Sequence, residues 1–398
     1  MKMTNKSKTF SELTNNKHSC YDDQTEVLTS EGWLYFKDLT DKHMVATLIN
    51  GDTLMYQKPL SIQSYDFNKK MYCVKSNQID LMVTPNHRML TKRHGSKHFR
   101  IEKSEDIHGK IVQYKKNVEK YNDFGMQKSS YIEGDFFVIT KNDKDGKSIK
   151  KYYNLNQFIE MFGIWIAEGC MLRDWGVSFA THKPRVKDAL ERLCNVENLN
   201  IKINKHINKK NDTVKNAWCI TDKHLVTYFK TVDVGAIKKS LPEWVWILDQ
   251  NQCRLLIDGM LLGDGHIVKG STTYRYDTSS TKLADDFQRL CLHAGYCSNI
   301  AIKYKAGHSA TIKKGNRKGE KITSTVDSYR MAVIKTQCEP KVNKNRKTNQ
   351  ADSWVKYKGK VYCCNVLGNS SIDKYNNVYD TGGIIYVRRN KYPSWSGN

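Results

Sequence analysis

Two apolar stretches of the sequence end in the same way, with an acidic residue followed by glycine. FIEMFGIWIAEG (158–169) carries Glu168 before its last residue, and CRLLIDGMLLGDG (253–265) carries Asp264 there. Both are strongly apolar and of helical length, which predicts two core helices with one carboxylate each at the C-terminal end. For one helix alone, a glycine cap beside a solvated acid is the simpler interpretation, but the duplication argues for a shared function.

Small residues lie four positions apart just before each acid. They are Gly163 and Ala167 in the first stretch, and Gly259 and Gly263 in the second. Residues at i and i+4 share a helix face, and the absence of large side chains there lets two helix backbones approach closely. Packed in this way, the two helices would bring their terminal carboxylates together at one end.

Such an acid pair has a chemical consequence. Two carboxylates within a few ångströms repel each other, so the arrangement calls for divalent cations. Two metal ions about 3.5–4 Å apart stabilise both the attacking and the leaving oxygen when a phosphodiester is hydrolysed. Magnesium suits an all-oxygen site that keeps several waters. We therefore expect two Mg²⁺ sites, shared by Glu168 and Asp264.

A second set of reactive residue types lies outside these helices. Cys20 precedes the strand-like TEVLT, the segment TPNHRML (84–90) contains Thr84 and His87, and the printed sequence closes on Asn398. A thiol beside a backbone carbonyl can turn the amide into a thioester if a neighbouring imidazole protonates the leaving nitrogen. A terminal carboxamide can attack its own carbonyl. A lone Cys is usually a small buried hydrophobe and a lone His a satisfied polar group, so the argument depends on their combined order.

Composition favours a nucleic-acid partner. Lys and Arg total 65 against 41 Asp and Glu, a formal net charge of +24, and residues 158–348 supply more than half of the excess. A polyanion fits this charge, and nucleic acid fits better than an acidic membrane surface. The eleven cysteines include no CxxC pair, which favours a reducing interior over a disulfide framework or zinc ribbon. We found no membrane span or signal peptide and expect a cytoplasmic protein, or one in its host protein's compartment, that is not secreted.

The residue composition and the predicted secondary structure change twice along the chain. Strand-like segments rich in Val, Ile, Thr and aromatic residues run from Cys20 to about Thr140 and return after about Asp352, while the polar stretch 140–154 is expected to be a linker. Between them, helical and strand-like pieces alternate in two copies, each opened by an acid-ended helix. An insertion that splits a β domain explains this order with the fewest assumptions.

The middle segment resembles the double-motif LAGLIDADG homing endonucleases (DOD type), with motifs MFGIWIAEG (161–169) and IDGMLLGDG (257–265). The resemblance covers about 155–350. It implies two pseudo-symmetric αββαββα halves whose sheets lie in the DNA major groove, with the two motif acids as metal ligands. The match of KKSLPEWVWIL implies Lys239 as a base or electrostatic helper, and Lys335 on YRMAVIKTQ is a second candidate.

The flanking segments resemble an intein, a self-splicing protein of the Hedgehog/intein (Hint) β fold. The resemblance implies that Cys20 attacks the carbonyl carbon of Ser19 and that Thr84 and His87 activate that bond. Cys363, in KVYCCNV, falls where the family has a residue that coordinates the two cleavages.

At the other end, the resemblance implies that Asn398 cyclises and cuts the chain. Gly397 stands where most inteins have His, so we expect slow C-terminal cleavage that a His at position 397 would accelerate if the pocket has room. Transesterification needs a Cys, Ser or Thr after Asn398, so we expect full splicing only of a chain that continues beyond it.

We predict an all-β Hint horseshoe split by an α+β LAGLIDADG domain. The predicted function is a monomeric, site-specific endonuclease that makes Mg²⁺-dependent breaks in an extended, asymmetric double-stranded DNA site and processes its flanking host segments (exteins). The alternatives are a DNA-binding element whose nuclease has decayed and an RNA-splicing maturase of the same family. The predicted segments are a leader at 1–19, the N-terminal Hint part at 20–150, the endonuclease at 151–350 and the C-terminal Hint part at 351–398.

Overall fold

A computed structural model describes residues 19–397 apart from short internal gaps. The gaps are 124–125, 127, 181–182, 209–212, 268–269, 271–272, 313–317, 345–349, 368–369, 373–377 and 381–382. The chain forms two compact units, and we refer to 1–119 with 337–398 as unit 1 and to 120–336 as unit 2. Among the described residues, no helix is long and apolar enough to cross a membrane.

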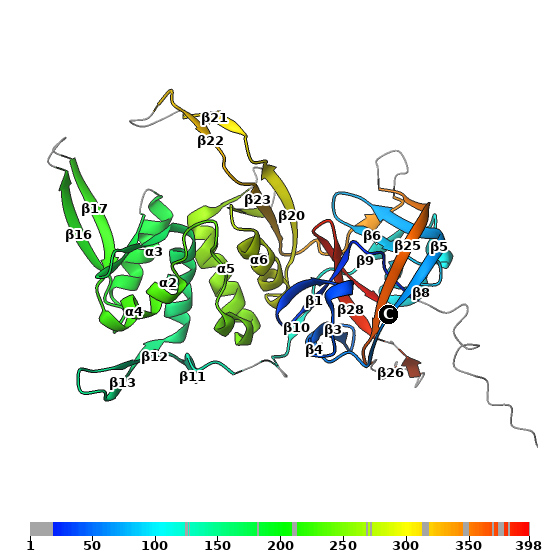
Figure 1. Ribbon diagram of the computed structural model, residues 1–398, viewed down its shortest axis with the longest axis horizontal. Coiled ribbons are helices and arrows are strands. Elements are labelled where there is room, and N and C mark those ends of the chain that lie inside the picture. The colour runs from blue at the N-terminus through cyan, green and yellow to red at the C-terminus, as the bar shows by residue number, and fades with distance from the viewer. Residues whose placement is uncertain are drawn as a thin grey trace, which may run out of the picture. The chain divides into compact units, whose positions relative to one another are not determined.

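Unit 1 is built almost wholly of strands (Figure 1). Its first part contains β1 (Thr25–Thr29), β2 (Gly32–Tyr35), the short 3-10 helix η1 (Phe36–Asp38), β3 (Val45–Ile49), β4 (Thr53–Gln57), β5 (Ser61–Lys75), β6 (Asp80–Val83), β7 (Arg88–Arg93), β8 (Arg100–Lys103), the one-turn helix α1 (Ser104–Ile107) and β9 (Val112–Tyr114). Its second part contains β24 (Lys341–Val342), β25 (Asp352–Asn365), β26 (Ser370–Ile372), β27 (Val378–Asp380), β28 (Ile384–Arg389) and β29 (Tyr392–Gly397).

The strands of unit 1 join segments from the two ends of the chain. One sheet has the order β4-β3-β1-β28-β29 with β2 also paired to β1, a second has the order β24-β9-β7-β8, and a third has the order β25-β5-β6. The β5–β25 ladder is long and antiparallel, running from Ser61 opposite Asn365 to Val74 opposite Asp352. The predicted β domain interrupted in sequence is therefore present as a single unit.

Buried ion pairs fix the first strand of unit 1 to the last strands. The Arg388 guanidinium lies 2.7 and 2.8 Å from the two carboxylate oxygens of Glu26. Arg389 donates to Asp22 at 2.8 Å and to Asp80 at 2.9 Å. Removing one partner of a buried pair leaves an uncompensated charge, which typically costs about 3–5 kcal/mol. These pairs therefore make the register between β1 and β28 specific.

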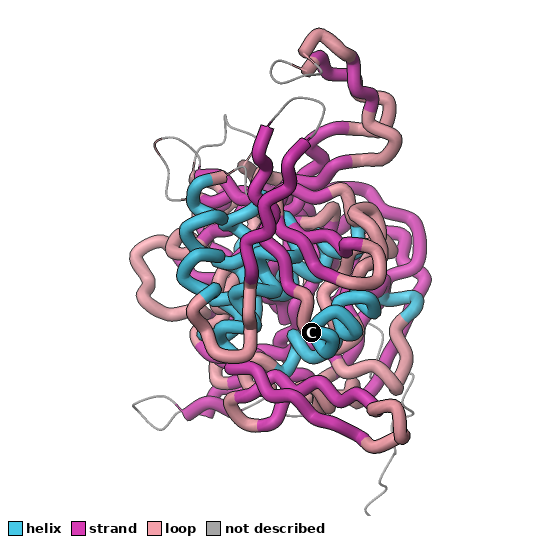
Figure 2. The backbone as a smooth tube through the Cα atoms, turned by 90° about the vertical axis from the view of Figure 1, so that its left-hand side faces the viewer, coloured by secondary structure: helices cyan, strands magenta, loops and turns pink. Residues whose placement is uncertain are grey.

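Unit 2 mixes helices with short sheets (Figure 2). It contains β10 (Lys120–Tyr121), β11 (Ile132–Glu133), β12 (Phe136–Asn142), β13 (Ser148–Asn154), α2 (Leu155–Glu168), β14 (Gly169–Leu172), β15 (Gly176–Phe179), α3 (Pro184–Cys194), β16 (Lys202–Asn208), β17 (Thr213–Ile220), α4 (Lys223–Val232), η2 (Glu243–Ile247), α5 (Gln250–Asp264), β18 (Gly265–Ile267), β19 (Tyr274–Thr278), α6 (Thr281–His293), β20 (Cys297–Tyr304), β21 (Ser309–Thr311), β22 (Lys321–Thr323) and β23 (Ser328–Ile334).

The two halves of unit 2 are related but unequal. The first runs α2-β14-β15-α3-β16-β17-α4, with the sheet order β14-β15-β17-β16, and has the predicted αββαββα sequence of elements. The second runs α5-β18-β19-α6-β20-β23, with the sheet order β18-β19-β23-β20. A β21–β22 hairpin interrupts it, and in the described part of unit 2 no helix follows β23. The second half therefore departs from the predicted αββαββα order.

The limits of unit 2 also differ from the predicted segment 151–350. The stretch 140–154, which we expected to be a linker, forms most of the β12–β13 hairpin. Phe137 of β12, just before that stretch, stacks on Phe158 of α2, and the two ring centroids lie 3.6 Å apart. Packing on α2 therefore places this hairpin in unit 2. At the other boundary, β24 pairs with β9, so residues 337–350 belong to unit 1.

Helices α2 and α5 pack against each other through the predicted small residues. A Cβ added at Gly163 would lie 2.7 Å from the Leu256 carbonyl oxygen, and one added at Gly259 would lie 2.7 Å from the Glu160 carbonyl oxygen. An added Cβ at Gly263 would lie 2.3 Å from that of Ala167. The expected close backbone approach is confirmed.

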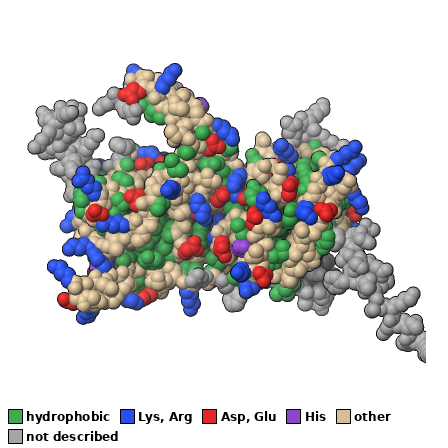
Figure 3. Space-filling model, viewed as in Figure 1, with side chains coloured by type: hydrophobic (Ala, Val, Ile, Leu, Met, Phe, Trp, Pro, Cys, Tyr) green, Lys and Arg blue, Asp and Glu red, His purple; other side chains and the backbone are tan. Residues whose placement is uncertain are grey.

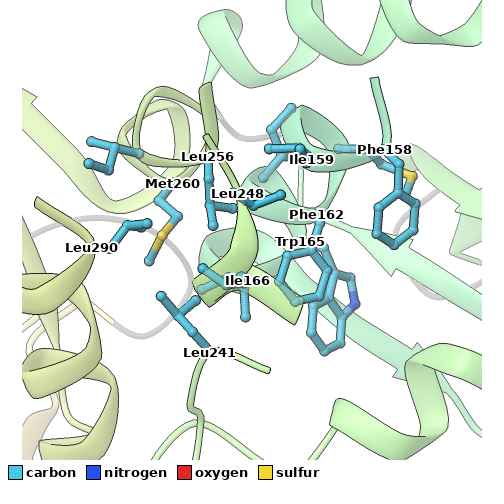
Figure 4. Packing of buried hydrophobic residues seen from close by; sticks show 14 of the residues in the cluster. Phe158, Ile159, Phe162, Trp165, Ile166, Leu241, Leu248, Leu256, Met260 and Leu290 are labelled. Atoms are coloured by element: carbon cyan, nitrogen blue, oxygen red, sulfur yellow. The ribbon is translucent and has the colours of Figure 1, made fainter. Parts of the chain in front are cut away.

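Large apolar side chains surround this contact (Figure 4). Phe158, Phe162 and Trp165 of α2 and Leu256 and Met260 of α5 are buried in one continuous cluster. Both helices begin with side-chain caps, a simple one at the start of α2 and a full capping box at the start of α5. Burial holds the helices together, and the caps fix where each begins.

We predict that Gly163→Ala lowers the free energy of unfolding by about 1–3 kcal/mol, because the new methyl group overpacks the α2–α5 contact. Urea unfolding followed by circular dichroism measures this change. Asp188→Ala, on the exposed face of α3, is the matched control and should stay within about 0.5 kcal/mol of the parent. Equal stability of Gly163→Ala and the parent would contradict the described contact.

Candidate functional sites

The predicted residues of the first site meet inside unit 1. The sulfur atoms of Cys20 and Cys363 are 3.4 Å apart, and both side chains are buried. Thr84 holds the Cys20 backbone at two points: its hydroxyl accepts from the Cys20 amide at 3.0 Å, and its own amide donates to the Cys20 carbonyl at 3.0 Å. The β5–β25 ladder and a bridge between Tyr21 and Tyr362 position the two cysteines.

The cysteine pair is polarised. The hydrogen bond to Cys363, reinforced by burial, raises the pKa of Cys20 far above its usual range. The same hydrogen bond, donated by the Cys20 thiol, lowers the pKa of Cys363 although burial opposes it. Cys20 is therefore the hydrogen-bond donor of the pair, and Cys363 is the cysteine that more readily loses its own proton.

His87 lies between the leader and the last strand. Its Nδ1 is 3.0 Å from the Ser19 hydroxyl, and its Nε2 is 2.9 Å from the Ser396 hydroxyl of β29. A hydrogen bond from the His87 amide to the Thr84 carbonyl, 3.0 Å long, places both residues in one turn as expected. Burial, helped by the charge of Arg88, lowers the pKa of His87 to about 3. The ring is therefore neutral near pH 7 and faces the Ser19 hydroxyl, while the Cys20 amide hydrogen bonds Thr84.

Position 397 has no room for a side chain. A Cβ there would lie 2.3 Å from the carbonyl oxygen of Arg88, and the Tyr21 hydroxyl donates to the Gly397 carbonyl at 2.8 Å. The room that a His at position 397 was expected to need is therefore absent in this arrangement, because the backbone of Arg88 fills that space. Asn398 lies outside the described residues.

The predicted acids of the second site are joined by a residue that the sequence analysis did not include. The Lys183 ammonium lies 2.5 Å from Glu168 Oε1 and 3.6 Å from Asp264 Oδ1, and it donates to the Gly263 carbonyl at 2.6 Å. Burial raises the pKa of Asp264, and the Glu168 charge adds to this while Lys183 opposes it. The acid-ended helices thus bring both carboxylates to one lysine.

The two predicted lysines occupy different surroundings. Lys239 donates to the Ile166 carbonyl at 2.6 Å, close to the end of α2, and burial lowers its pKa. Lys335 instead pairs with Asp258 at 3.4 Å and lies over the ring of Tyr274. The structure therefore places Lys239, and not Lys335, next to the C-terminal turn that carries Glu168.

Three side chains at these sites were not predicted, those of Ser19, Ser396 and Lys183, although Ser19 was named for its carbonyl carbon. The two serines carry no pattern that separates them from surface residues, and only folding brings them to His87. Lys183 directly precedes Pro184 at the start of α3. That Lys-Pro pair indicates a helix start but gives no indication of a contact with α5.

Comparison with known families supports the interpretation of unit 2. Residues 251–332 match the family of LAGLIDADG-like domains, a range that includes most of α5 with Asp264. With the division of the β unit around unit 2, the predicted resemblance is confirmed. Unit 2 is thus similar over those residues to LAGLIDADG-like domains, and the β unit that it divides agrees with the predicted resemblance to an intein.

Two curated relatives share much of the chain. The DNA-directed RNA polymerase subunit beta C-terminal section of Stigeoclonium helveticum is 27% identical over 97% of this chain and 37% of its own length. The ATP-dependent Clp protease proteolytic subunit of Chlamydomonas moewusii is 32% identical over 71% of this chain and 28% of its own length. The chain therefore spans well under half of each relative.

Solved structures with similarity to the chain include a splice-inactive variant of the AceL NrdHF class 3 split intein. It is 16% identical and covers 33% of this chain and 97% of that one, with a TM-score of 0.22. The I-DmoI complex with DNA and Ca is 14% identical and covers 45% of this chain and 83% of that one, with a TM-score of 0.30.

We predict that His87 makes unit 1 less stable in mild acid. Its pKa is about 3 in the folded protein and about 6.5 in the unfolded chain, so the unfolded chain binds more protons between these values. The free energy of unfolding should then fall as the pH drops below about 6.5. His87→Gln should weaken this fall, and His98→Gln, at an exposed position, should not. Urea unfolding at pH 7, 6 and 5 gives the slopes, and equal slopes for His87→Gln and the parent would contradict the assignment.

Proposed function

We propose that this chain is an intein-encoded, site-specific DNA endonuclease that also processes its own flanking segments. The observation that carries the nuclease proposal is the acid pair, in which Glu168 and Asp264 end two adjacent helices and share Lys183. The proposed substrate is an extended, asymmetric double-stranded DNA site, and the proposed cofactor is Mg²⁺. The protein would act as a monomer, because one chain supplies both acids.

The residues present fit a divalent cation by their chemistry. Glu168 and Asp264 supply carboxylate oxygens, and their side chains are 14% and 41% exposed, so a phosphate oxygen or water can reach them. No group of three or more Cys, His, Asp or Glu suited to a metal occurs in the described parts of the chain, so water and phosphate oxygens would complete the site. When bound, the cation polarises the phosphodiester and lowers the pKa of a bound water.

The protein's own groups would then position the reacting phosphate. The lowered pKa of Lys239 keeps its amine closer to the neutral form than an exposed lysine, which suits a base or a proton donor beside the acid pair. The hydrogen bond from Lys239 to the Ile166 carbonyl fixes the amine in the last turn of α2, two residues before Glu168. The two acids would hold the cation, and Lys239 lies at the same end of α2.

The surface agrees with a nucleic-acid partner, although on the face shown in Figure 3 the positive side chains are spread out and not gathered in one patch. Lys and Arg side chains occur over much of the face shown in Figure 3, with Asp and Glu among them. Hairpins β16–β17 and β21–β22 project from unit 2 (Figure 1), and a stretch from 304 to 322 that includes β21 carries many basic residues. Basic loops of this kind contact phosphates and supply salt-dependent affinity rather than base recognition.

We predict that Glu168→Gln and Asp264→Asn each lower the rate of Mg²⁺-dependent DNA cleavage by more than about 100-fold, because even indirect disturbance of a metal site reaches that size. DNA affinity should change little. The assay uses DNA that carries the host coding sequence with the insertion removed, and electrophoresis measures cleavage and binding separately.

Asp188→Asn, an exposed carboxylate on α3, is the control and should cut at the parent rate. Cleavage by both acid variants at the parent rate would reject the assignment. A parent that binds this DNA but never cuts it would favour the decayed nuclease.

Unit 1 supports the self-processing part of the proposal through the cysteine pair. The Cys20 thiol proton would move to Cys363 in its thiolate form, and the Cys20 sulfur would attack the Ser19 carbonyl carbon. A carbon–sulfur bond would form, the bond from that carbon to the Cys20 nitrogen would break, and the Cys363 thiol would return the proton to that nitrogen. Thr84 orients the leaving nitrogen through the 3.0 Å hydrogen bond, and the His87–Ser19 contact holds the leader at the bond.

We predict that added hydroxylamine releases residues 1–19 from the protein, because a nucleophile intercepts the thioester at Cys20. Cys20→Ala should abolish release, Thr84→Val should slow it, and Cys170→Ala, at an exposed thiol of unit 2, should leave it unchanged. Mass spectrometry over a time course follows the released leader. An intact leader in the parent after long incubation would show that this site is inactive.

A further inference from the structure

We propose that Lys183 is a built-in counter-ion of the acid pair. It holds Glu168 and Asp264 in the protein free of DNA and must leave them before a divalent cation can bind there. This inference rests on the proposed endonuclease function and concerns how its site is kept inactive. The direct contacts are 2.5 Å to Glu168, 3.6 Å to Asp264 and 2.6 Å to the Gly263 carbonyl.

The segment that carries Lys183 is anchored to the end of α5. Arg185, two residues later, donates to the carbonyl of Leu262 at 2.6 Å, to that of Gly263 at 2.9 Å and to that of Gly265 at 2.5 Å. The last carbonyls of a helix lack partners within the helix and form the negative end of its dipole, which attracts cations. The start of α3 is therefore held against the end of α5, and this places the Lys183 side chain at the acid pair.

Among the described residues, the equivalent N-cap positions of the two halves of unit 2 carry different groups. Lys183 is the N-cap residue of α3, and the N-cap residue of the corresponding α6 is Ser280. The Ser280 hydroxyl donates to the Lys239 carbonyl at 2.6 Å and accepts from the Leu283 amide at 3.1 Å. Ser280 thus completes a helix cap, whereas Lys183 places a positive charge on the acid pair.

This charge opposes a second cation. The ammonium group takes up negative charge that would otherwise attract the metal, and like charges a few ångströms apart repel strongly where solvent is partly excluded. The Lys183 side chain is 40% exposed, so it can turn outward without unfolding its neighbours. A DNA phosphate arriving at the site gives the ammonium a new anionic partner and frees the two carboxylates for the metal.

The test is Mn²⁺ binding to the full chain without DNA, measured by isothermal titration calorimetry. Lys183→Met should bind Mn²⁺ at least about tenfold more tightly than the parent, since the local positive charge is gone. Lys183→Arg keeps that charge and should resemble the parent. Lys187→Met is the control, because Lys187 lies one turn further along α3 and pairs with Glu191.

Two further variants make the outcome specific. Lys183→Gln keeps a hydrogen-bond donor for the Gly263 carbonyl. It replaces Lys183→Met in the test if thermal melting shows that Lys183→Met does not fold. In the Lys183→Met background, Glu168→Gln with Asp264→Asn should remove the gained affinity. A folded Lys183→Met or Lys183→Gln protein with the parent's affinity would overturn the inference about Lys183 alone. Tight Mn²⁺ binding that survives loss of both acids would instead contradict the proposed endonuclease site.

Discussion

The close backbone approach of α2 and α5 determines what unit 2 can do. Gly163 and Gly259 face each other with no side chain between them, and an added Cβ at either would lie 2.7 Å from a carbonyl oxygen of the opposite helix. Two helices that approach this closely keep their ends in a fixed relation, because neither can slide without overlap. The acids at those ends therefore stay within reach of one lysine. A larger residue at either glycine would force the two helices to repack. The positions of the two carboxylates therefore depend on the spacing of the glycines.

Unit 1 depends on a different device, because its reactive residues come from opposite ends of the chain. The sulfurs of Cys20 and Cys363 can meet only when the β5–β25 ladder forms and the first strand pairs with β28. Buried charges make that pairing specific: Arg389 has two carboxylate partners, Asp22 and Asp80, which would lose their counter-ion in any other register. Burial of an unpaired charge is costly. The ion pairs of Arg389 therefore favour the register of β28 in which Cys20 and Cys363 meet.

The sequence alone predicted the features that repeat or that carry unusual residue types. The acid-glycine endings, the small residues four apart and the split β texture all follow from local pattern, and the helix contact is as expected. The assignment of β12 and β13 to a unit was not predictable, because strand-forming residues do not indicate the partner on which Phe137 packs. The space at Gly397 depends on the Arg88 backbone, and the position of Lys183 depends on Arg185 reaching the carbonyls of Leu262, Gly263 and Gly265. Contacts of this kind arise only from tertiary packing.

Both sites hold their reactive groups engaged at rest, but the partner differs in a way that bears on control. In unit 1 the Cys20 thiol donates to the Cys363 sulfur 3.4 Å away, so the proposed first step would need only groups of the folded unit. In unit 2 the Lys183 ammonium group pairs with both carboxylates. A proton transfer between the two acids would not remove this ammonium group. In our proposal it leaves when another anion binds it, and a DNA phosphate would supply that anion. Under the proposed function, folding would suffice to activate the first site, whereas the second would stay closed to a metal ion until a DNA phosphate binds Lys183.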